Sequence, residues 1–529
     1  MRTGKSQTSG QNLKDSFRPD QESKTAANTR GYLKYLLEWS QAKLTLRVQK
    51  WSREHPWIVV ISWVAVTLGL LFGALLAREN SFMFQSENQA ANGELLEGVV
   101  AHLSPTANSL IILAMLVIFM LTSFGTVAAA LIGLGLAVTN LIIITSLLVL
   151  TRPPLSSEDI PAAIIIGLVG LGTSIDYSLF IVSRFRFKLR TSGNSHEALE
   201  LAGASGGNAN FASTIVWTIA LSGLILVRDQ TLTTIAIGTL GLIIIALLGS
   251  LTFIQALLAL LETRINFAPL PYFGNDEKEG TGIWGRVVVF AARHHHGSAI
   301  AAIIFLGVLC LPLFQLRLAP LLSQSTLLNI TGNITTEAEY LFNLVIIWAF
   351  VAGLTFVVVA LMSRSFLLAV VTVLISLLST GAALGVVVQV FDIGWFKELL
   401  GFKGQSSTID RGLPLLLFPL FFGFSMSYQI LTINRISEKL EKGSSTRVAV
   451  INGPRVVSGV VVSAGAITRT AITLMLVAQF AAIQQLGLGL VVSIYLDAVV
   501  VRCILVPAVL QLLSRKNWYL PVNQPAENR

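Results

Sequence analysis

The sequence predicts an all-α polytopic membrane protein with about twelve transmembrane helices in two parallel six-helix repeats. Three observations support this prediction: the composition, a series of long apolar runs and an internal repeat. Hydrophobic residues make up 53% of the 529 positions and charged residues only 12%, about half the charged fraction of an average soluble domain. The mean hydropathy is +0.72. A soluble globular protein is not expected from these values.

Twelve apolar runs are long enough to cross a bilayer as helices, which takes about 20 residues. They occupy approximately residues 57–77, 107–122, 126–150, 160–183, 211–227, 231–261, 298–316, 343–362, 366–390, 412–433, 457–478 and 486–513. The run at 231–261 is too long for one untilted span, so we expect it to continue as helix beyond the membrane.

The runs divide the chain into five expected segments. These are a polar tail with an interfacial helix (1–56), the first six-helix repeat (57–262), a cytoplasmic linker (263–297), the second six-helix repeat (298–513) and a cytoplasmic tail (514–529). Within the first tail, residues 31–53 mix Leu, Tyr and Trp with Lys and Arg, which is typical of a helix lying on a membrane surface.

The distribution of Lys and Arg predicts the orientation. With the N-terminus in the cytoplasm, 28 of the 37 basic residues lie on the cytoplasmic side and 7 lie outside, as the positive-inside rule requires. Both termini are therefore expected in the cytoplasm. The net charge of +9 follows from this asymmetry and from the anionic inner membrane surface, so no nucleic-acid partner is expected.

The internal repeat is clearest in the fourth and tenth runs. IDYSLFIVSR (175–184) aligns with MSYQILTINR (426–435) at an offset of 251 residues, which places Tyr177 opposite Tyr428. The two runs are six spans apart, an even number, so they cross the membrane in the same direction. Two parallel halves related by an axis along the membrane normal are common in transporters.

These features resemble the RND superfamily, and within it the MmpL-type branch. The D-Y pair in the fourth span, followed by S-R at its end, resembles the superfamily pattern. GLGLVVSIYLDAVVVRCILVPAVLQLLSRKNWYLP (487–521) resembles the last span and ending of that branch, and FQSENQAANGELL (84–96) resembles the start of its first external domain. The resemblance implies a transporter of the bacterial inner membrane that uses the proton gradient to export lipids or other hydrophobic compounds.

The sequence departs from the family in two respects. The external segments 78–106 and 317–342 are too short for the family's folded external domains. Whether accessory external proteins replace these domains, and whether the chain forms a homo-oligomer, the sequence leaves open. Ser427 stands in the tenth span where the family repeats its Asp, so half of the family's proton relay is missing.

Asp176 is the residue best suited to carry protons. A charge inside a bilayer costs between about 3 and about 15 kcal/mol, and a carboxylate in a low dielectric takes up a proton more readily than one in water. Tyr177 and Tyr428 offer hydroxyls that relay or orient that proton. The alternative is a structural carboxylate that stays hydrogen-bonded between helices.

A buried carboxylate needs a partner, and Arg469 in the predicted eleventh span is our candidate for Asp176. Arg469 is expected about 18 Å from the cytoplasmic face and Asp176 about 12 Å from it. An Arg side chain is long enough to cover this difference. Asp497 and Arg502 are secondary candidates, with helix packing as the alternative role for Asp497. Five residues place them about 140° apart on an α-helix, so we do not expect a direct pair. Arg502 is the next candidate partner for Asp176.

Three classes of function follow. The first is a proton-coupled exporter or flippase for a lipid or other hydrophobic compound. The second is a reduced, non-transporting relative that acts as a scaffold or regulator of a lipid transport system. The third, an intramembrane aspartyl hydrolase, needs two acids close together, whereas Asp176 and Asp497 are expected about 12 Å and about 25 Å deep. We therefore expect a transporter and no enzyme.

No cofactor or metal site is predicted. His294–His296 lie beside a span without an acidic or Cys cluster, and the GLG at 170–172 does not open a phosphate-binding helix after a strand. The expected partners are protons, a lipid or hydrophobic small molecule, and the membrane itself.

Overall fold

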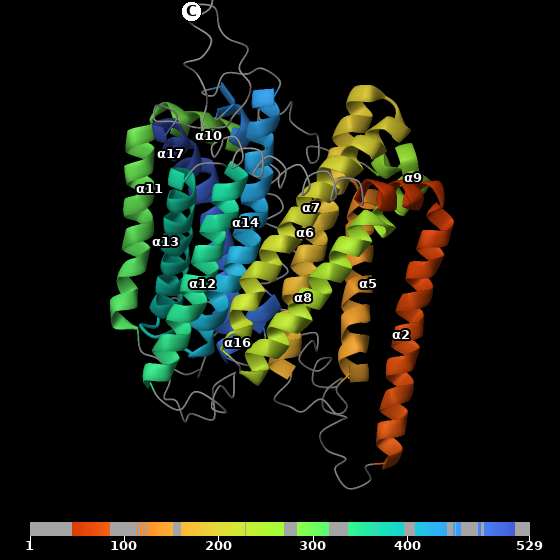
Figure 1. The fold of residues 1–529 in the computed structure, drawn as a ribbon, viewed down its shortest axis with the longest axis horizontal. Coiled ribbons are helices and arrows are strands. Elements are labelled where there is room, and N and C mark those ends of the chain that lie inside the picture. Colours follow the sequence, from red (N-terminus) through yellow and green to blue (C-terminus); the bar gives the residue numbers. More distant parts are fainter. Residues whose placement is uncertain are drawn as a thin grey trace, which may run out of the picture.

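The computed structural model describes residues 45–84, 114, 117–118, 120–121, 124–151, 160–227, 229–268, 283–316, 337–363, 366–395, 408–441, 448–449, 451–455, 474–477 and 481–513. In these ranges the regular secondary structure is helical, which confirms the predicted fold class. Ten helices among the described residues are long and apolar enough to cross a membrane. They run side by side in one bundle (Figure 1).

The membrane helices follow the predicted order along the chain. The first half contains α2 (Pro56–Phe84), α5 (Val127–Thr151), α6 (Ile160–Ser192), α7 (Ser195–Ile225) and α8 (Gln230–Leu251). The second half contains α11 (His295–Cys310), α12 (Glu337–Ser363), α13 (Phe366–Phe391), α14 (Gly412–Glu441) and a last span of three segments, α16 (Ala481–Tyr495), the π-helix η6 (Leu496–Leu505) and α17 (Val506–Leu513). Ten predicted spans correspond to these helices, while 107–122 and 457–478 fall almost entirely outside the described residues.

Several helices are longer than the apolar runs that predicted them, because a run marks only the part of a helix that must be apolar. α6 continues nine residues past the predicted end at 183, and α7 begins well before the run at 211. The two meet at a tight turn. Gly193 adopts φ +68°, which ends α6. The Asn194 side chain then accepts hydrogen bonds from the backbone N–H groups of His196 and Glu197 and caps α7.

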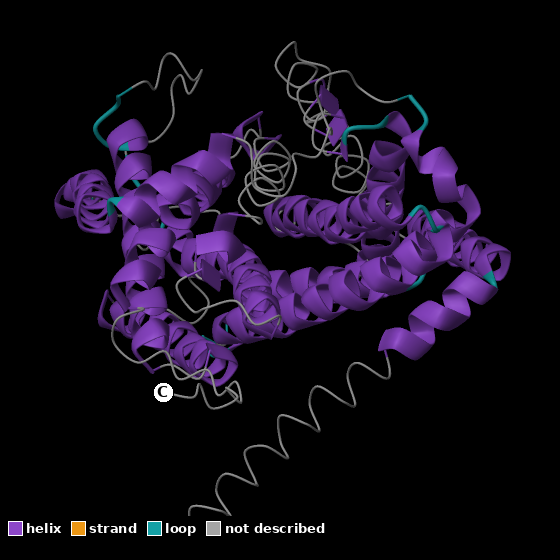
Figure 2. Ribbon diagram, turned by 90° about the horizontal axis from the view of Figure 1, so that it is seen from above, coloured by secondary structure: helices purple, strands orange, loops and turns teal. Residues whose placement is uncertain are grey.

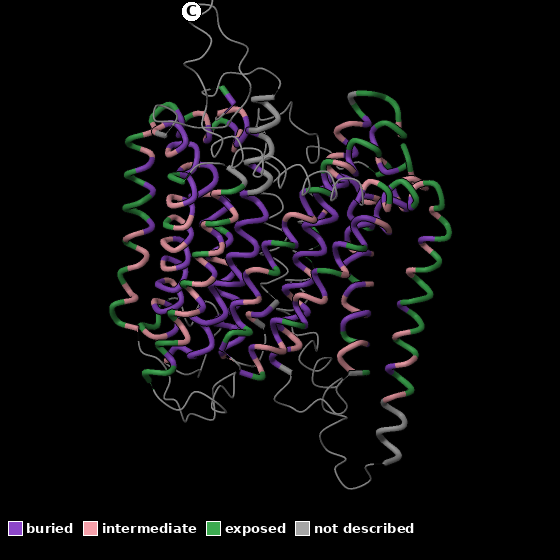
Figure 3. Tube along the Cα trace, viewed as in Figure 1, coloured by how far each residue is buried: buried purple, intermediate pink, exposed green. Residues whose placement is uncertain are grey.

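The two halves repeat the same packing. In the first half α5 contacts α2, α6 and α8, and in the second half α13 contacts α11, α14 and α16, the helices at the equivalent positions. The equivalent helices α2 and α11 lie at opposite edges of the bundle (Figures 1 and 2). Most of their surface is exposed, whereas α6 and α14 lie at the centre and are almost entirely buried (Figure 3). Three of the predicted relay residues, Asp176, Tyr177 and Tyr428, are therefore carried by the two most buried of the described spans.

The halves meet where α7 packs against α14 and α12. At the centre of this contact the Trp217 ring, which is 1% exposed, lies on the backbone of Gly423 and meets the Phe424 ring edge-on at 4.8 Å. Residue 423 must be small, because a Cβ there would fall inside the indole ring. This close approach brings α14 against the first half and thereby sets the distance between the relay residues.

The long run at 231–261 is helical, as expected, except at Thr252, where it divides into two helices. α8 ends at Leu251, and α9 (Phe253–Leu261) continues in a new direction into a short 3₁₀ turn, η2 (Glu262–Asn266). At the break, the N–H and the hydroxyl of Thr252 both donate to the carbonyl of Leu248. The Thr252 hydroxyl also accepts a hydrogen bond from Trp63 Nε1 at 2.9 Å, which ties the bend to α2.

Two short helices lie at the same end of the bundle as α9. One covers residues 45–54 and is called the N-terminal helix below. The other is α10 (Ile283–Arg293), which contacts η6 and α17. His294–His296 stand at the junction of α10 and α11, partly or largely exposed.

The contact between the halves predicts a steric test. Gly423→Ala places a methyl group inside the Trp217 ring, so we expect it to destabilise the protein by about 1–3 kcal/mol, the usual range for overpacking. The readout is the thermal unfolding midpoint in detergent. Trp217→Leu in the same chain should recover part of the loss.

Gly353→Ala is the matched control, because Gly353 lies exposed on α12 and its added Cβ meets no atom within 4 Å. Equal midpoints for the two variants would show that Gly423 does not set the spacing between the halves.

Candidate functional site

Asp176 lies at the midpoint of α6, 16 residues from each end of the helix. At 1.5 Å per residue, about 24 Å of helix separates it from either end of α6. Its side chain is 5% exposed. Burial at this depth is costly for a charged group unless a partner supplies hydrogen bonds.

The other half of the molecule supplies such a partner. The hydroxyl of Tyr428, on α14, donates a hydrogen bond of 2.9 Å to Oδ2 of Asp176. Tyr428 is 1% exposed, and the Phe180 ring meets its ring edge-on at 6.3 Å. The predicted relay residues Asp176 and Tyr428 are thus in direct contact across the repeat, although 252 residues separate them in the sequence.

Tyr177 is placed differently from its repeat equivalent. Its hydroxyl donates a hydrogen bond of 2.9 Å to Oγ1 of Thr214 on α7, because the single hydroxyl hydrogen of Thr214 is donated elsewhere. Asn210 Nδ2 donates to the backbone carbonyl of Tyr177 at 3.1 Å, and the Thr214 hydroxyl donates to the carbonyl of Asn210. Tyr177 therefore connects the relay helix to a polar face of α7.

A second polar connection reaches α5. Asn140 Nδ2 donates to Ser174 Oγ at 2.9 Å, and the Ser174 hydroxyl donates to the carbonyl of Gly170 within α6. Both Asn140 and Ser174 are completely buried. Asp176 is thus surrounded by helices that offer polar side chains at its level.

Ser427, which occupies the position of the missing second Asp, makes no equivalent contact with the described residues of the first half. Its hydroxyl donates to the carbonyl of Gly423 one turn earlier in α14, at 2.9 Å. Its hydrogen is used inside its own helix, a common arrangement for Ser in membrane helices.

The prediction that Asp497 and Arg502 do not pair is wrong. Arg502 Nε donates to Asp497 Oδ2 at 3.1 Å, and both side chains are about 95% buried. The prediction assumed α-helical geometry, but residues 496–505 form a π-helix, in which residues five apart in the chain are neighbours along the hydrogen-bond ladder. The i, i+5 pair is therefore the natural one.

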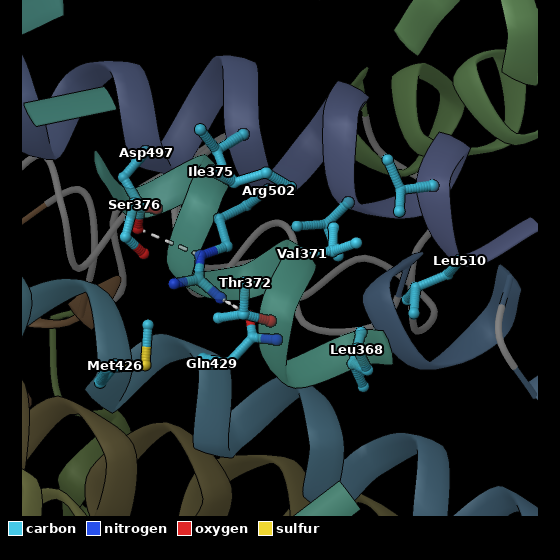
Figure 4. Close-up of a pocket in the computed structure, with 13 residues that line it drawn as sticks. Leu368, Val371, Thr372, Ile375, Ser376, Met426, Gln429, Asp497, Arg502 and Leu510 are labelled. Atoms are coloured by element: carbon cyan, nitrogen blue, oxygen red, sulfur yellow. Dashed lines mark hydrogen bonds and ion pairs between the residues drawn. The ribbon is translucent and has the colours of Figure 1, made fainter. Parts of the chain in front are cut away.

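The pair is also bound to α14. Ser425 donates its hydroxyl to Asp497 Oδ1 at 3.0 Å. Arg502 donates through Nη1 to Gln429 Oε1 and through Nη2 to the carbonyl and hydroxyl of Ser425. Figure 4 shows Arg502 between Asp497 and Gln429. These contacts correct a second expectation: Arg502 is the partner of Asp497, and its guanidinium is fully engaged there.

The expected difference in depth between the two acids is wrong as well. The α14 residues that bind them, Tyr428 and Ser425, are three positions apart, or about 4.5 Å along the helix axis. The estimate failed because α6 extends to Ser192, so Asp176 lies farther from its helix end than the apolar run indicated.

A small cavity adjoins the ion pair of Asp497 and Arg502. Its accessible volume is about 20 Å³, which suffices for one water molecule. Its polar wall consists of Asp497, Arg502, Gln429, Thr372 and Ser376, and apolar side chains, most of them from α13 and α17, complete it (Figure 4). A cavity of this size holds water and excludes a lipid.

Arg469 lies outside the described residues, so its pairing with Asp176 stays a prediction. Other partners were missed at the sequence level: Thr214 and Asn210 for Tyr177, and Ser425 and Gln429 for the ion pair. A signal existed for each, because polar side chains inside long apolar runs are costly. Asn210, Ser213 and Thr214 cluster at the start of the fifth run.

The ion pair predicts a non-additive pair of substitutions. Asp497→Asn or Arg502→Gln alone leaves a buried, unpaired charge, so we expect each to destabilise the protein by about 3–5 kcal/mol. The double variant removes both charges and should recover much of that stability. A double-mutant cycle on thermal or denaturant unfolding measures the coupling.

Ser427→Ala is the control for this cycle, since its hydroxyl bonds only within its own helix turn. Strictly additive losses for Asp497 and Arg502 would show that the two side chains do not pair.

Comparison with known proteins agrees with this architecture. Mycolic acid-containing lipids exporter MmpL11 of Mycolicibacterium smegmatis is 26% identical over 526 residues, covering 76% of this chain and 54% of that protein. Heme uptake protein MmpL11 of Mycobacterium tuberculosis is 25% identical, with coverages of 77% and 54%. The chain thus spans about half the length of these relatives.

The fold resembles a solved membrane protein as well. The crystal structure of SecDF, a translocon-associated membrane protein from Thermus thermophilus, superposes with a TM-score of 0.54 at 15% identity, covering 77% of this chain and 62% of that one. At this identity the likeness concerns the fold alone. The family model described as MMPL family matches residues 104–296 and 324–529, and the chain therefore belongs to the MMPL family.

Proposed function

We propose that this protein is a proton-coupled transporter that exports or flips a lipid or another hydrophobic compound across the bacterial inner membrane. The observation on which the proposal rests is the hydrogen bond from Tyr428 to Asp176. This bond joins Asp176, the predicted proton carrier in the first half, to α14 of the second half at the centre of the bundle.

The bond responds to protonation. A hydrogen bond to an ionised carboxylate is roughly twice as strong as one between neutral groups. When Asp176 takes up a proton, its negative charge is lost and the bond from Tyr428 weakens. When the acid releases the proton, the strong bond forms again. Proton binding therefore changes the attraction between α6 and α14, and with it the packing of the two halves.

Movement between the halves supplies a route for substrate. In transporters built from two repeats, alternating access arises when one repeat shifts against the other. The contact of Trp217 with Gly423 and Phe424 is apolar, so a small tilt breaks no hydrogen bond between these residues. A lipid enters such a transporter sideways from the bilayer, which suits the broad lipid-facing surfaces of α2 and α11.

A lipid-like substrate is favoured by two observations. A relative that is 26% identical is named as an exporter of mycolic acid-containing lipids. The cavity beside the ion pair has room for about one water molecule, so a lipid-sized substrate does not fit there, and we place its route at the margin between helices and lipid.

Catalysis by the two acids is not part of the proposal. Both oxygens of Asp497 accept hydrogen bonds from Ser425 and Arg502, which holds this acid as an ion pair. An aspartyl hydrolase instead needs two carboxyl groups that share a proton.

A second function is favoured by Ser427. Because its hydroxyl bonds to its own helix, the second half has no acid at the repeat position, and a non-transporting scaffold or regulator of a lipid transport system would tolerate this loss. Proton flux distinguishes the two functions, since a scaffold has no need to move protons.

The decisive test of the transporter is proton uptake into proteoliposomes under an imposed pH gradient. Asp176→Asn should abolish protein-dependent uptake while leaving insertion intact, because it removes the buried charge. Tyr428→Phe should lower the uptake rate by roughly tenfold, the effect of losing about one hydrogen bond in the transition state.

Ser427→Ala serves as the control at the equivalent position of the repeat and should retain the wild-type rate. Wild-type uptake by Asp176→Asn would refute proton coupling through this site, and absence of uptake by the wild-type protein would favour the scaffold.

A further inference from the structure

We propose that one face of α7, together with Gln49 and Gln255, forms a hydrated path along which protons move between Asp176 and the end of the bundle that carries the N-terminal helix. The proposal rests on the proton coupling proposed above and names its path on the cytoplasmic side. It assigns a transport role to two glutamines far from the relay residues.

The path follows a stripe along α7. Gly203, Gly207, Asn210 and Thr214 are spaced by four, three and four residues, so they share one face of the helix. The stripe extends over eleven residues, or about 16 Å. At its inner end, Thr214 and Asn210 contact the hydroxyl and the backbone carbonyl of Tyr177, the residue next to Asp176.

At its outer end the stripe has no side chains of its own, and two glutamines fill the space. A Cβ on Gly203 would lie 2.7 Å from Gln49 Oε1 and 3.1 Å from Gln255 Nε2 and Oε1. A Cβ on Gly207 would collide with Gln49 Nε2. The two glycines thus bring both amides against the backbone of α7, one turn before Asn210.

The glutamines come from separate elements. Gln49 belongs to the N-terminal helix, which buries Thr45, Gln49 and Ser52 on one face. Thr45 Oγ1 donates to Asn208 Oδ1 at 3.3 Å, which fixes this helix on α7. Gln255 belongs to α9, directly after the break at Thr252.

These amides lack hydrogen-bond partners among the described residues. Gln49 and Gln255 are both fully buried, and neither the nitrogen nor the oxygen of either amide forms a hydrogen bond within the described part of the chain. The same holds for Oδ1 of Asn210 and Oγ of Ser213. Burying such groups without a partner is costly, and ordered water is the usual solution in a polar interior.

Six polar atoms of this kind along one helix face define a line of water sites. Amides suit a proton path because each offers a donor and an acceptor to water and does not itself hold the proton. The step is simple: the carboxylic acid of Asp176 gives its proton to an adjacent water, leaving a carboxylate and a hydronium ion. The excess proton passes along the hydrogen-bonded waters and is released at the surface.

Proton uptake into proteoliposomes tests the path. The double variant Gln49→Leu/Gln255→Leu replaces both amides by apolar groups of similar size, and its uptake rate should fall by at least about tenfold, since one hydrogen bond is enough to change a rate by that factor. Gln49→Glu keeps a polar group and should retain substantial uptake.

Ser52→Ala is the matched control on the N-terminal helix, because the Ser52 hydroxyl donates to Val48 of the same helix at 2.9 Å. It should keep the wild-type rate. Suppose that Asp176→Asn abolishes uptake but the double leucine variant takes up protons at the wild-type rate. That result would overturn the path and leave the proposed function standing. Uptake that does not depend on Asp176 would instead overturn the proposed function.

Hydroxyl-radical footprinting of the unmodified protein gives an independent result if the leucine variant unfolds. Radicals generated from bound water oxidise nearby side chains. Leu251 is 5% exposed, and its Cδ2 lies 2.9 Å from the Cβ position of Gly207, so it should be oxidised several-fold faster than Leu258, a fully buried residue of α9. Equal protection of the two leucines would contradict a hydrated path.

Discussion

The hydrogen bond between Tyr428 and Asp176 is the interaction on which the rest of this structure depends. A carboxylate at the middle of a membrane helix is stable only when the surrounding protein supplies hydrogen bonds, and here the donor belongs to the other half of the chain. This requirement explains why α14 lies against the first half, and why Gly423 must let the Trp217 ring approach the α14 backbone. In the function we propose, the same bond that stabilises the acid makes the packing of the halves sensitive to its protonation.

The two halves use their buried acids differently. Asp176 accepts a hydrogen bond from Tyr428 across the interface between the halves. Asp497 is instead held by Arg502 from its own helix and by Ser425 from α14. Ser425 and Gln429, which bind the ion pair, flank Tyr428 on α14. The ion pair therefore holds the part of α14 that presents the Tyr428 hydroxyl to Asp176. The loss of the acid at Ser427 leaves this support in place.

Much of the fold follows from the sequence because bilayer physics restricts the solutions. A helix that crosses the membrane must be apolar over about 20 residues, so ten spans were located to within a few residues at most of their ends. The repeat also pointed to Tyr428 as a hydroxyl that serves Asp176, but the sequence named Arg469 as the partner of that acid and did not predict the direct hydrogen bond from Tyr428. The ion pair did not follow, because nothing in LDAVVVRCIL indicates a π-helix, and an α-helical register separates Asp497 from Arg502.

Polar packing between distant segments was the other feature beyond reach of the sequence. Gln49 and Gln255 are unremarkable residues in a basic tail and at the end of a long apolar run. Only the folded arrangement places both against Gly203 of α7, and Gln49 against Gly207 as well. The hydrogen bond between Tyr177 and Thr214 likewise depends on how α7 is rotated about its axis relative to α6. A single sequence does not specify this rotation.

Infrared difference spectroscopy of the reconstituted protein tests the central claim most directly, because it detects the carbonyl band of a protonated carboxylic acid. Acidification should produce a band that is absent in Asp176→Asn and shifted in Tyr428→Phe, since the hydroxyl of Tyr428 donates to that carboxyl group. A band that persists in Asp176→Asn, or that is identical in Tyr428→Phe and the wild type, would contradict a proton-sensitive bond between the halves.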